Sequence, residues 1–145
     1  MAREHQDLAA RVVEMALGVR FERPRKLGGW GQADGCGVLA DGRLVVLEIE
    51  CAQKHPDTNI LKLWPYLEDD SACSVLLVQV FFEASLGRGS SRDRLGAWLA
   101  ERMQRELAGR FRYCRLVLGQ DGSFLEGLAA LKDAVAHVDA SRMGT

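Results

Sequence analysis

The sequence predicts a single α/β domain in which helices cover both faces of a mixed β-sheet. Its 145 residues match the common size of one domain, and they contain no internal repeat, low-complexity run or long linker. Strand-like and helix-like runs alternate along the chain, which is typical of an α/β fold. We expect residues 1–139 to form the domain and residues 140–145, which carry no apolar pattern, to form a disordered tail.

The chain begins with an amphipathic helix, expected over His5–Leu17. Its apolar residues recur at helical spacing, and Gly18 follows as a stop signal. An edge strand is expected at Val19–Arg25, with Pro24 near its end because proline cannot donate a ladder hydrogen bond. The glycine-rich residues 27–31 then predict a loop without regular structure.

Two paired strands are expected next, at Asp34–Leu39 and Arg43–Glu50. Residues 40–42 read Ala-Asp-Gly, which is a hairpin signal because glycine accepts a positive φ. The second strand is apolar on both faces until its end, which is typical of a central strand.

The second half of the chain predicts three helices and two further strands. A continuous, β-branched run, SVLLVQVFFE, indicates a strand that is buried between helices. Pro56 is suited to the first turn of a helix, and Pro65 would stop or kink that helix. The expected elements are a helix at Pro56–Trp64, a strand at Ser74–Glu83, a helix at Arg92–Ala108, a strand at Tyr113–Leu118 and a helix at Phe124–Val138.

Composition places the protein in the cytoplasm and away from the membrane. No stretch reaches the roughly 18 apolar residues of a membrane span, and the amphipathic N-terminus lacks the order of a signal peptide. The four cysteines form no Cys-x-x-Cys pair and have no histidine at zinc spacing, so we interpret them as reduced, buried side chains. The formal net charge of −1 argues against a broadly basic nucleic-acid wrapper.

Three carboxylates, Asp34, Glu48 and Glu50, are the candidate site. Glu48 and Glu50 are two apart on one strand, so they share a face of the sheet. A two-residue turn would set Asp34 opposite Ile49 and on the other face, whereas a three-residue loop with Gly42 left-handed sets Asp34 opposite Glu48. We predict the second register, because Ala-Asp-Gly fits that loop.

Clustered carboxylates at the end of an apolar strand repel one another and lose hydration, so a cation is expected to compensate them. Mg²⁺ (or Mn²⁺) suits them, because it takes oxygen ligands and is usually held by one or two carboxylates together with substrate phosphate oxygens. Such an ion activates water and stabilises a leaving oxygen, so the implied reaction is phosphodiester hydrolysis.

The spacing Asp34, thirteen residues, Glu48-Ile49-Glu50, placed after a helix and a strand, resembles the PD-(D/E)XK (restriction-endonuclease-like) nuclease superfamily. The resemblance covers about the first 80 residues. It implies a three-layer fold with an α-β-β-β-α-β core, Asp34, Glu48 and Glu50 as metal ligands, and DNA as the partner. Cleavage of both strands usually calls for two active sites, so a homodimer is the expected assembly.

One residue departs from the family pattern, since Glu50 stands at the position of the usual lysine. Some members recruit a lysine from the following helix, and Lys62 is the expected replacement here, with Lys54 as second choice. A lysine would help to orient or deprotonate the attacking water. Members often carry a further acidic ligand in the first helix, where this chain has Glu4 and the neutral Gln6.

Nucleic-acid contacts are expected from a basic segment before the first carboxylate. Residues 20–26 hold four cations and one anion, which suits a phosphate backbone. The candidate contacts are Arg23, Arg25, Lys26 and Lys54.

Two alternatives remain open. The protein can be a catalytically inactive member of the same fold that binds nucleic acid or protein, a reading favoured by Glu50 and the near-neutral charge. It can also be a flavodoxin-like binding domain, although the Asp41-Gly42 hairpin argues against a wholly parallel sheet.

Overall fold

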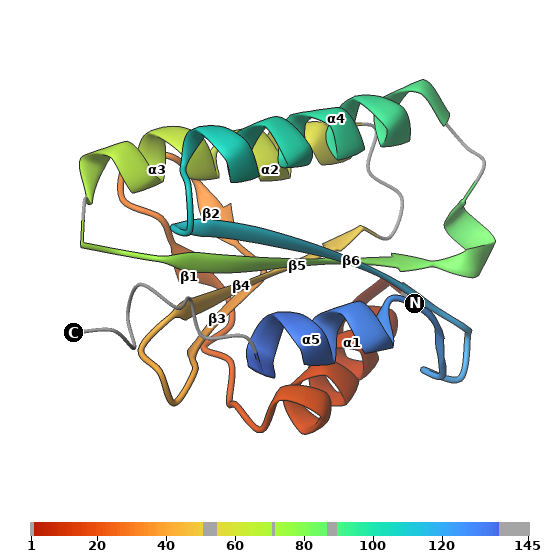
Figure 1. Ribbon diagram of the computed structural model, residues 1–145. Helices are drawn as coiled ribbons and strands as arrows, with labels where there is room; N and C mark the ends of the chain where they lie inside the picture. The colour runs from red at the N-terminus through yellow and green to blue at the C-terminus, as the bar shows by residue number, and fades with distance from the viewer. Residues whose placement is uncertain (1, 51–54, 71, 87–89, 137–145) are drawn as a thin grey trace.

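The computed structural model describes residues 2–50, 55–70, 72–86 and 90–136 (Figure 1). Cys51, Lys54 and the predicted tail at 140–145 lie outside these residues. The element order is α1, β1–β4, α2, α3, β5, the 3₁₀ turn η1 at Glu83–Ser85, α4, β6, β7 and α5.

A five-stranded mixed sheet forms the middle layer. Its strands lie in the order β3 (Gly35–Val38), β4 (Leu44–Glu50), β5 (Val75–Phe82), β6 (Phe111–Leu118) and β7 (Phe124–Glu126). β4, β5 and β6 are parallel, whereas β3 and β7 run antiparallel at the two edges. Every residue of β4 and β5 is buried, as their apolar runs predict. The predicted mixed α/β architecture is confirmed.

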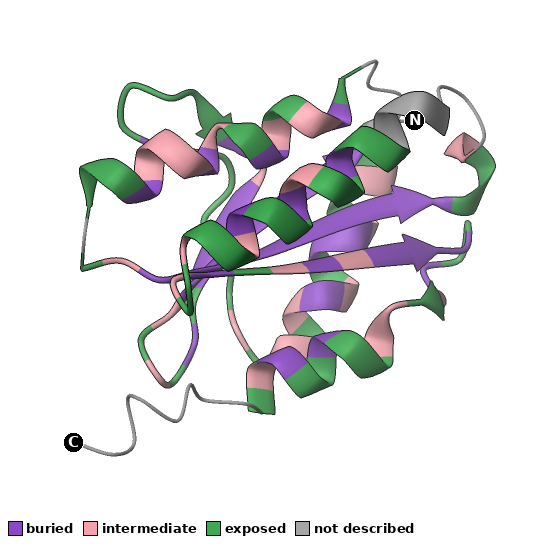
Figure 2. Cartoon of the chain, turned by 45° about the horizontal axis from the view of Figure 1, so that its top comes forward, coloured by how far each residue is buried: buried purple, intermediate pink, exposed green. Residues whose placement is uncertain are grey.

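Helices cover both faces of the sheet (Figure 1). α1 (Ala2–Leu17) and α5 (Leu128–Ala136) lie on one face, and α2 (Pro56–Leu61), α3 (Leu63–Asp69) and α4 (Ser90–Glu106) lie on the other. Each helix buries one side and exposes the other (Figure 2). The two faces therefore have separate apolar cores.

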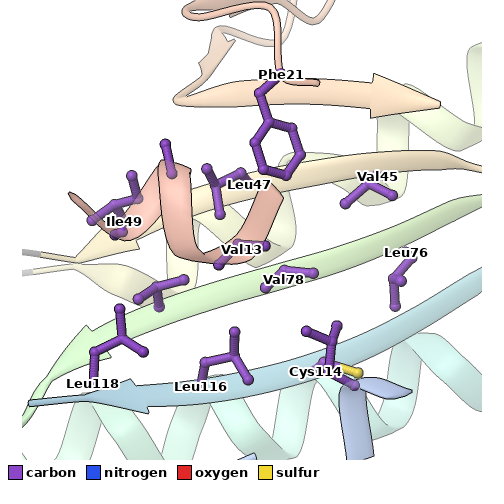
Figure 3. Close-up of a cluster of buried hydrophobic side chains, with 14 of the residues drawn as sticks. Val13, Phe21, Val45, Leu47, Ile49, Leu76, Val78, Cys114, Leu116 and Leu118 are labelled. Carbon is purple, nitrogen blue, oxygen red and sulfur yellow. The ribbon is translucent and has the colours of Figure 1, made fainter. Parts of the chain in front are cut away.

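The core under α1 and α5 is a cluster of apolar side chains. Alternate residues of β4, β5 and β6 point into it, and Val13 of α1 and Phe21 pack with them (Figure 3). The opposite core, under α2, α3 and α4, receives the other set of alternate residues, including Val46 and Leu77. Glu48 and Glu50 belong to this second set, since they continue the alternation from Val46.

The predicted register of the β3–β4 hairpin is confirmed. Gly35 lies opposite Leu47 and Val38 opposite Leu44, so Asp34 is set opposite Glu48. Gly42 has a φ of +93°, and its N–H donates to the Leu39 carbonyl across the three-residue loop.

The prediction of an edge strand over Val19–Arg25 is wrong. Of residues 19–24 only Glu22 pairs, through two backbone hydrogen bonds to Cys36. The chain then forms a two-residue strand β1 (Arg25–Lys26) that pairs with β2 (Gln32–Ala33). Pro24 has no N–H to give, so the ladder is interrupted at that residue. The glycine-rich residues 27–31 are the loop of this small β1–β2 hairpin, closed by the Leu27 N–H donating to the Gly31 carbonyl.

The helix expected to stop or kink at Pro65 is divided at Lys62, and the chain remains helical to Asp69. Proline has no N–H to donate to the carbonyl of Leu61, four residues earlier, so the hydrogen-bond ladder is interrupted at this turn. Lys62 stays in the right-handed helical region, and α3 continues α2 with only a short break.

The final helix is expected at Phe124–Val138, and its predicted start is wrong, because residues 124–126 form the edge strand β7. Asp121-Gly122 makes the turn before it, with Gly122 at a φ of +86°. This is the same Asp-Gly signal that marks the first hairpin, and it was present in the sequence. Gly127, at a φ of +94°, then ends the strand and opens α5.

No helix of the described residues is long and apolar enough to cross a membrane. The three cysteines within the described residues, Cys36, Cys73 and Cys114, are free.

Gly127 is predicted to tolerate no side chain. A Cβ there would lie 2.1 Å from the Arg115 carbonyl oxygen, and the positive φ would add strain. Gly28 is the matched control, since it has a φ of +61° but no atom within 4 Å of the added Cβ. Urea unfolding should show a loss of more than about 3 kcal/mol for Gly127→Ala and about 1 kcal/mol for Gly28→Ala. Equal losses would mean that φ alone matters.

Candidate functional site

Asp34 and Glu48 face each other across the β3–β4 pair. Asp34 occupies the bend between β2 and β3, and its Oδ2 accepts a hydrogen bond of 2.7 Å from the Ile49 N–H. The Asp34 N–H in turn reaches Glu48 Oε1 at 3.4 Å. Each carboxylate is thus attached to the backbone of the other strand. The structure brings the two side chains together on one face, while their chemical role stays a prediction.

Lys62 joins this pair from the junction of α2 and α3. Its Nζ lies 2.5 Å from Glu48 Oε2 and donates to the Gln32 carbonyl at 2.6 Å and to Asn59 Oδ1 at 3.0 Å. These three acceptors match the three donors of an ammonium group. The residue expected to replace the missing family lysine is therefore in direct contact with a candidate metal ligand.

Glu50 lies one pleat further along β4 and is 3% exposed. Its Oε1 accepts hydrogen bonds from Asn59 Nδ2 at 2.7 Å and from Gln79 Nε2 at 3.0 Å. Its Oε2 is buried, and no hydrogen-bond donor among the described residues reaches it. A buried carboxylate oxygen without a donor is costly, and a cation is one means of compensating it.

Gln79 is a buried polar neighbour of Glu50 that the sequence analysis missed. It lies opposite Glu48 in the parallel β4–β5 pair and is 1% exposed. Its Nε2 also donates to the Pro56 carbonyl at 3.0 Å, and Tyr113 Oη donates to its Oε1 at 2.6 Å. A signal was available, because Gln79 is the one polar residue within β5, and a buried amide needs partners.

Burial dominates the electrostatics of the site. Desolvation raises the pKa of Glu48 to about 8, although the nearby Lys62 ammonium acts to lower it. Desolvation also raises the pKa of Glu50, against the hydrogen bonds from Gln79 and Asn59. The charge of Asp34 adds to both upward shifts. Holding these groups ionised therefore requires a positive charge nearby.

The donor set suits a hard divalent ion, since it consists of carboxylate oxygens and includes the buried, unpartnered Oε2 of Glu50. Within the described residues, however, no three His, Cys, Asp or Glu side chains already stand in a metal-holding group. The cation beside Glu48 is the ammonium of Lys62. An ion that took Glu48 Oε2 as a ligand would have to displace this ammonium.

The other predicted residues lie apart from the carboxylates. Arg23 pairs with Asp7 of α1 at 3.0 Å, and the Arg25 side chain lies 4.0 Å from Glu22. Lys26 is exposed on β1. All three belong to or precede the β1–β2 hairpin, which leads directly into Asp34 and accepts the Lys62 hydrogen bond at Gln32.

Trp30 and Glu4 gain no role at this site. The Trp30 side chain donates to Asp69 Oδ2 at 2.7 Å, which fixes the loop of the β1–β2 hairpin against the end of α3. Glu4 is exposed in the first turn of α1, and that helix covers the opposite face of the sheet from Glu48 and Glu50.

Comparison with known proteins gives one structural likeness. The chain is similar to SfsA from Pyrococcus furiosus in complex with Ca²⁺, with 13% sequence identity and a TM-score of 0.48. The likeness covers 83% of this chain, which spans 58% of the length of that protein. No family model and no curated protein matches the sequence. The function is therefore inferred from the chain's own residues.

The buried carboxylates predict a stability that falls as pH rises. Glu50 has a pKa raised above its ordinary value of 4.5, so between these two values the folded state holds a proton that the unfolded state releases. Stability from this group is complete below pH 4.5 and is lost as pH rises through the folded pKa. Without metal, thermal melts from pH 5 to 9 should decline in the wild type and decline less in Glu50→Gln.

The control is Glu68→Gln, because Glu68 is exposed at the end of α3. Its melting temperatures should follow those of the wild type at every pH. A Glu50→Gln profile as steep as the wild-type profile would contradict the assignment of Glu50 as a buried acid with a raised pKa.

Proposed function

We propose that this chain has a restriction-endonuclease-like, PD-(D/E)XK fold and is a Mg²⁺- or Mn²⁺-dependent nuclease that hydrolyses phosphodiester bonds in DNA. The observation that carries the proposal is the contact of Lys62 with Glu48 beside Asp34. Two carboxylates on paired strands and a lysine from the next helix are the three parts that the resemblance to this superfamily requires.

Asp34, Glu48 and Glu50 would hold the ion through carboxylate oxygens. The first two come from neighbouring strands, and the third adds its buried, unpartnered Oε2. When bound, the ion would supply positive charge that polarises the phosphate and favours ionisation of a water. The raised pKa values of Glu48 and Glu50 support this assignment, because acids with strongly shifted pKa values cluster at functional sites.

Lys62 would take the role of the family lysine, whose usual position holds Glu50. Its ammonium already contacts Glu48 and is held by the Gln32 carbonyl and by Asn59, so its position is determined by several bonds. An ammonium at this place would offset phosphate charge and orient the attacking water. Asn59 would keep Lys62 and Glu50 apart while it bonds to both.

DNA would lie along the basic β1–β2 hairpin. Arg23, Arg25 and Lys26 precede the site in the chain, and Lys54 follows it. Phosphate contacts of this kind position a duplex without reading its sequence. A homodimer would present two such sites to the two strands.

The second candidate function is binding of nucleic acid or protein by the same fold, without cleavage of DNA. The observation that favours it is the Lys62–Glu48 ion pair itself, which provides Glu48 with a cation without any metal. Metal stabilisation separates the two functions, because an ion that binds only the folded state must raise its melting temperature.

The nuclease proposal predicts that Mn²⁺ and Mg²⁺ raise the melting temperature relative to EDTA at pH 8, and that Asp34→Asn abolishes this rise. The same substitution should abolish nicking of supercoiled plasmid under the same conditions. Asp133→Asn is the control, because Asp133 is half exposed on α5 and pairs with Arg112 on the far face of the sheet. It should keep both properties.

If metals leave the wild-type melting curve unchanged while labelled DNA still binds, the non-cleaving function is correct. If neither metal nor DNA binds, both the nuclease function and DNA binding without cleavage are excluded.

A separate prediction concerns Lys62→Met. Loss of the ammonium should lower the nicking rate by a factor on the order of 10², because the water loses its orienting group. The metal-induced rise in melting temperature should persist or grow, since the ion no longer competes for Glu48 Oε2. Arg102→Met, which changes an exposed cation of α4, should leave nicking and metal response unchanged. Equal loss of metal response and nicking in Lys62→Met would show that Lys62 only supports the fold.

A further inference from the structure

A buried polar chain lies behind Glu50. It runs from Tyr113 on β6 through Gln79 on β5 to Glu50 on β4, in hydrogen bonds of 2.6 and 3.0 Å. It therefore crosses three parallel strands inside a core that is apolar along most of its length. Polar groups at this depth are costly unless they are satisfied, so their arrangement calls for a reason.

The orientation of the Gln79 amide is determined by its partners. Glu50 Oε1 and the Pro56 carbonyl both lie 3.0 Å from the amide nitrogen. The Pro56 carbonyl can only accept a hydrogen bond, so the NH₂ group of Gln79 must face it. The amide oxygen is then left to accept from the Tyr113 hydroxyl. The Pro56 carbonyl prevents the amide from turning over, and the Tyr113 hydroxyl holds the amide oxygen in place.

The consequence for Glu50 is that its two oxygens become different. Oε1 receives two N–H donors, from Gln79 and Asn59, whereas Oε2 receives none from the described residues. Tilting the carboxylate out of its plane would break the bonds to Oε1. Glu50 is thus held with its second oxygen in a fixed place that no donor of the described residues reaches.

We propose that Gln79, locked by Tyr113 and the Pro56 carbonyl, is a positioning residue that presents Glu50 Oε2 to the divalent cation. This inference rests on the proposed nuclease function and deepens it. Groups that orient a metal ligand without touching the ion typically change metal affinity by 10- to 100-fold when they are removed. Tyr113 acts at one further remove, through the amide.

The test measures the Mn²⁺ dissociation constant by isothermal titration well below the melting temperature, together with melting in EDTA. Tyr113→Phe removes one hydroxyl and should weaken Mn²⁺ binding by about tenfold. Tyr66→Phe is the matched control, because Tyr66 is also half-buried against the same core and takes no part in the hydrogen bonds that link Tyr113, Gln79 and Glu50. It should leave the dissociation constant unchanged.

Gln79→Met is the second variant, since it keeps the length of the side chain and removes both its donor and its acceptor. It should weaken Mn²⁺ binding at least as much as Tyr113→Phe. If Gln79→Met does not fold, Tyr113→Phe decides the matter alone. A merely structural role would lower melting in EDTA and leave the Mn²⁺ constant of the folded protein unchanged, which would overturn the inference.

The two levels of the proposal fail in different ways. Mn²⁺ binding that is lost in Asp34→Asn but unchanged in Tyr113→Phe and Gln79→Met overturns only the positioning role. Absence of Mn²⁺ binding in the wild type overturns both that role and the metal-dependent function.

Discussion

A three-residue loop at 40–42 decides on which side of the sheet Asp34 lies. Successive residues of a strand point to opposite faces, so a loop shorter by one residue would move Asp34 away from Glu48. Gly42 makes the longer loop possible through its φ of +93°, and the Leu39 and Arg43 backbones close it. The contacts among Asp34, Glu48 and Lys62 all depend on this register.

The second constraint is the burial of charge at the end of β4. Glu48 and Glu50 are almost wholly excluded from water, and removing an ionised group from water is costly unless a partner compensates it. The two carboxylates have different partners. Glu48 receives an ammonium from Lys62, and Glu50 receives the amides of Asn59 and Gln79. No donor from the described residues reaches Glu50 Oε2, and the proposed cation would compensate this oxygen.

The two faces of the sheet have divided tasks. The face under α1 and α5 buries a large cluster of apolar side chains and supplies stability through their burial. The face under α2, α3 and α4 is apolar along most of its length and becomes polar where β4 and β5 approach their carboxyl ends. Such ends are where sheets with parallel strands commonly bind ligands, because the loops that follow leave room above them. The location of the polar cluster agrees with that rule.

Local signals carried much of the fold. The alternation of apolar runs predicted the sheet strands β4 and β5, and Asp41-Gly42 predicted the hairpin and its register, because these depend on side-chain periodicity and on one glycine. Two elements were missed where local signals compete. Pro24 broke an edge strand that its neighbours favoured, and the turn at Asp121-Gly122 formed a hairpin inside a run that also suits a helix.

The sequence by itself determined which carboxylates share a face and that Lys62 would follow them on a helix, since both follow from the regular periods of strands and helices. Only the tertiary structure decided which atoms meet. The contact of Lys62 with Glu48 and the hydrogen bond of Tyr113 to Gln79 join residues that are 14 and 34 positions apart. Such contacts depend on how the strands pair and how the helices pack on the sheet, and no period within one element encodes that arrangement.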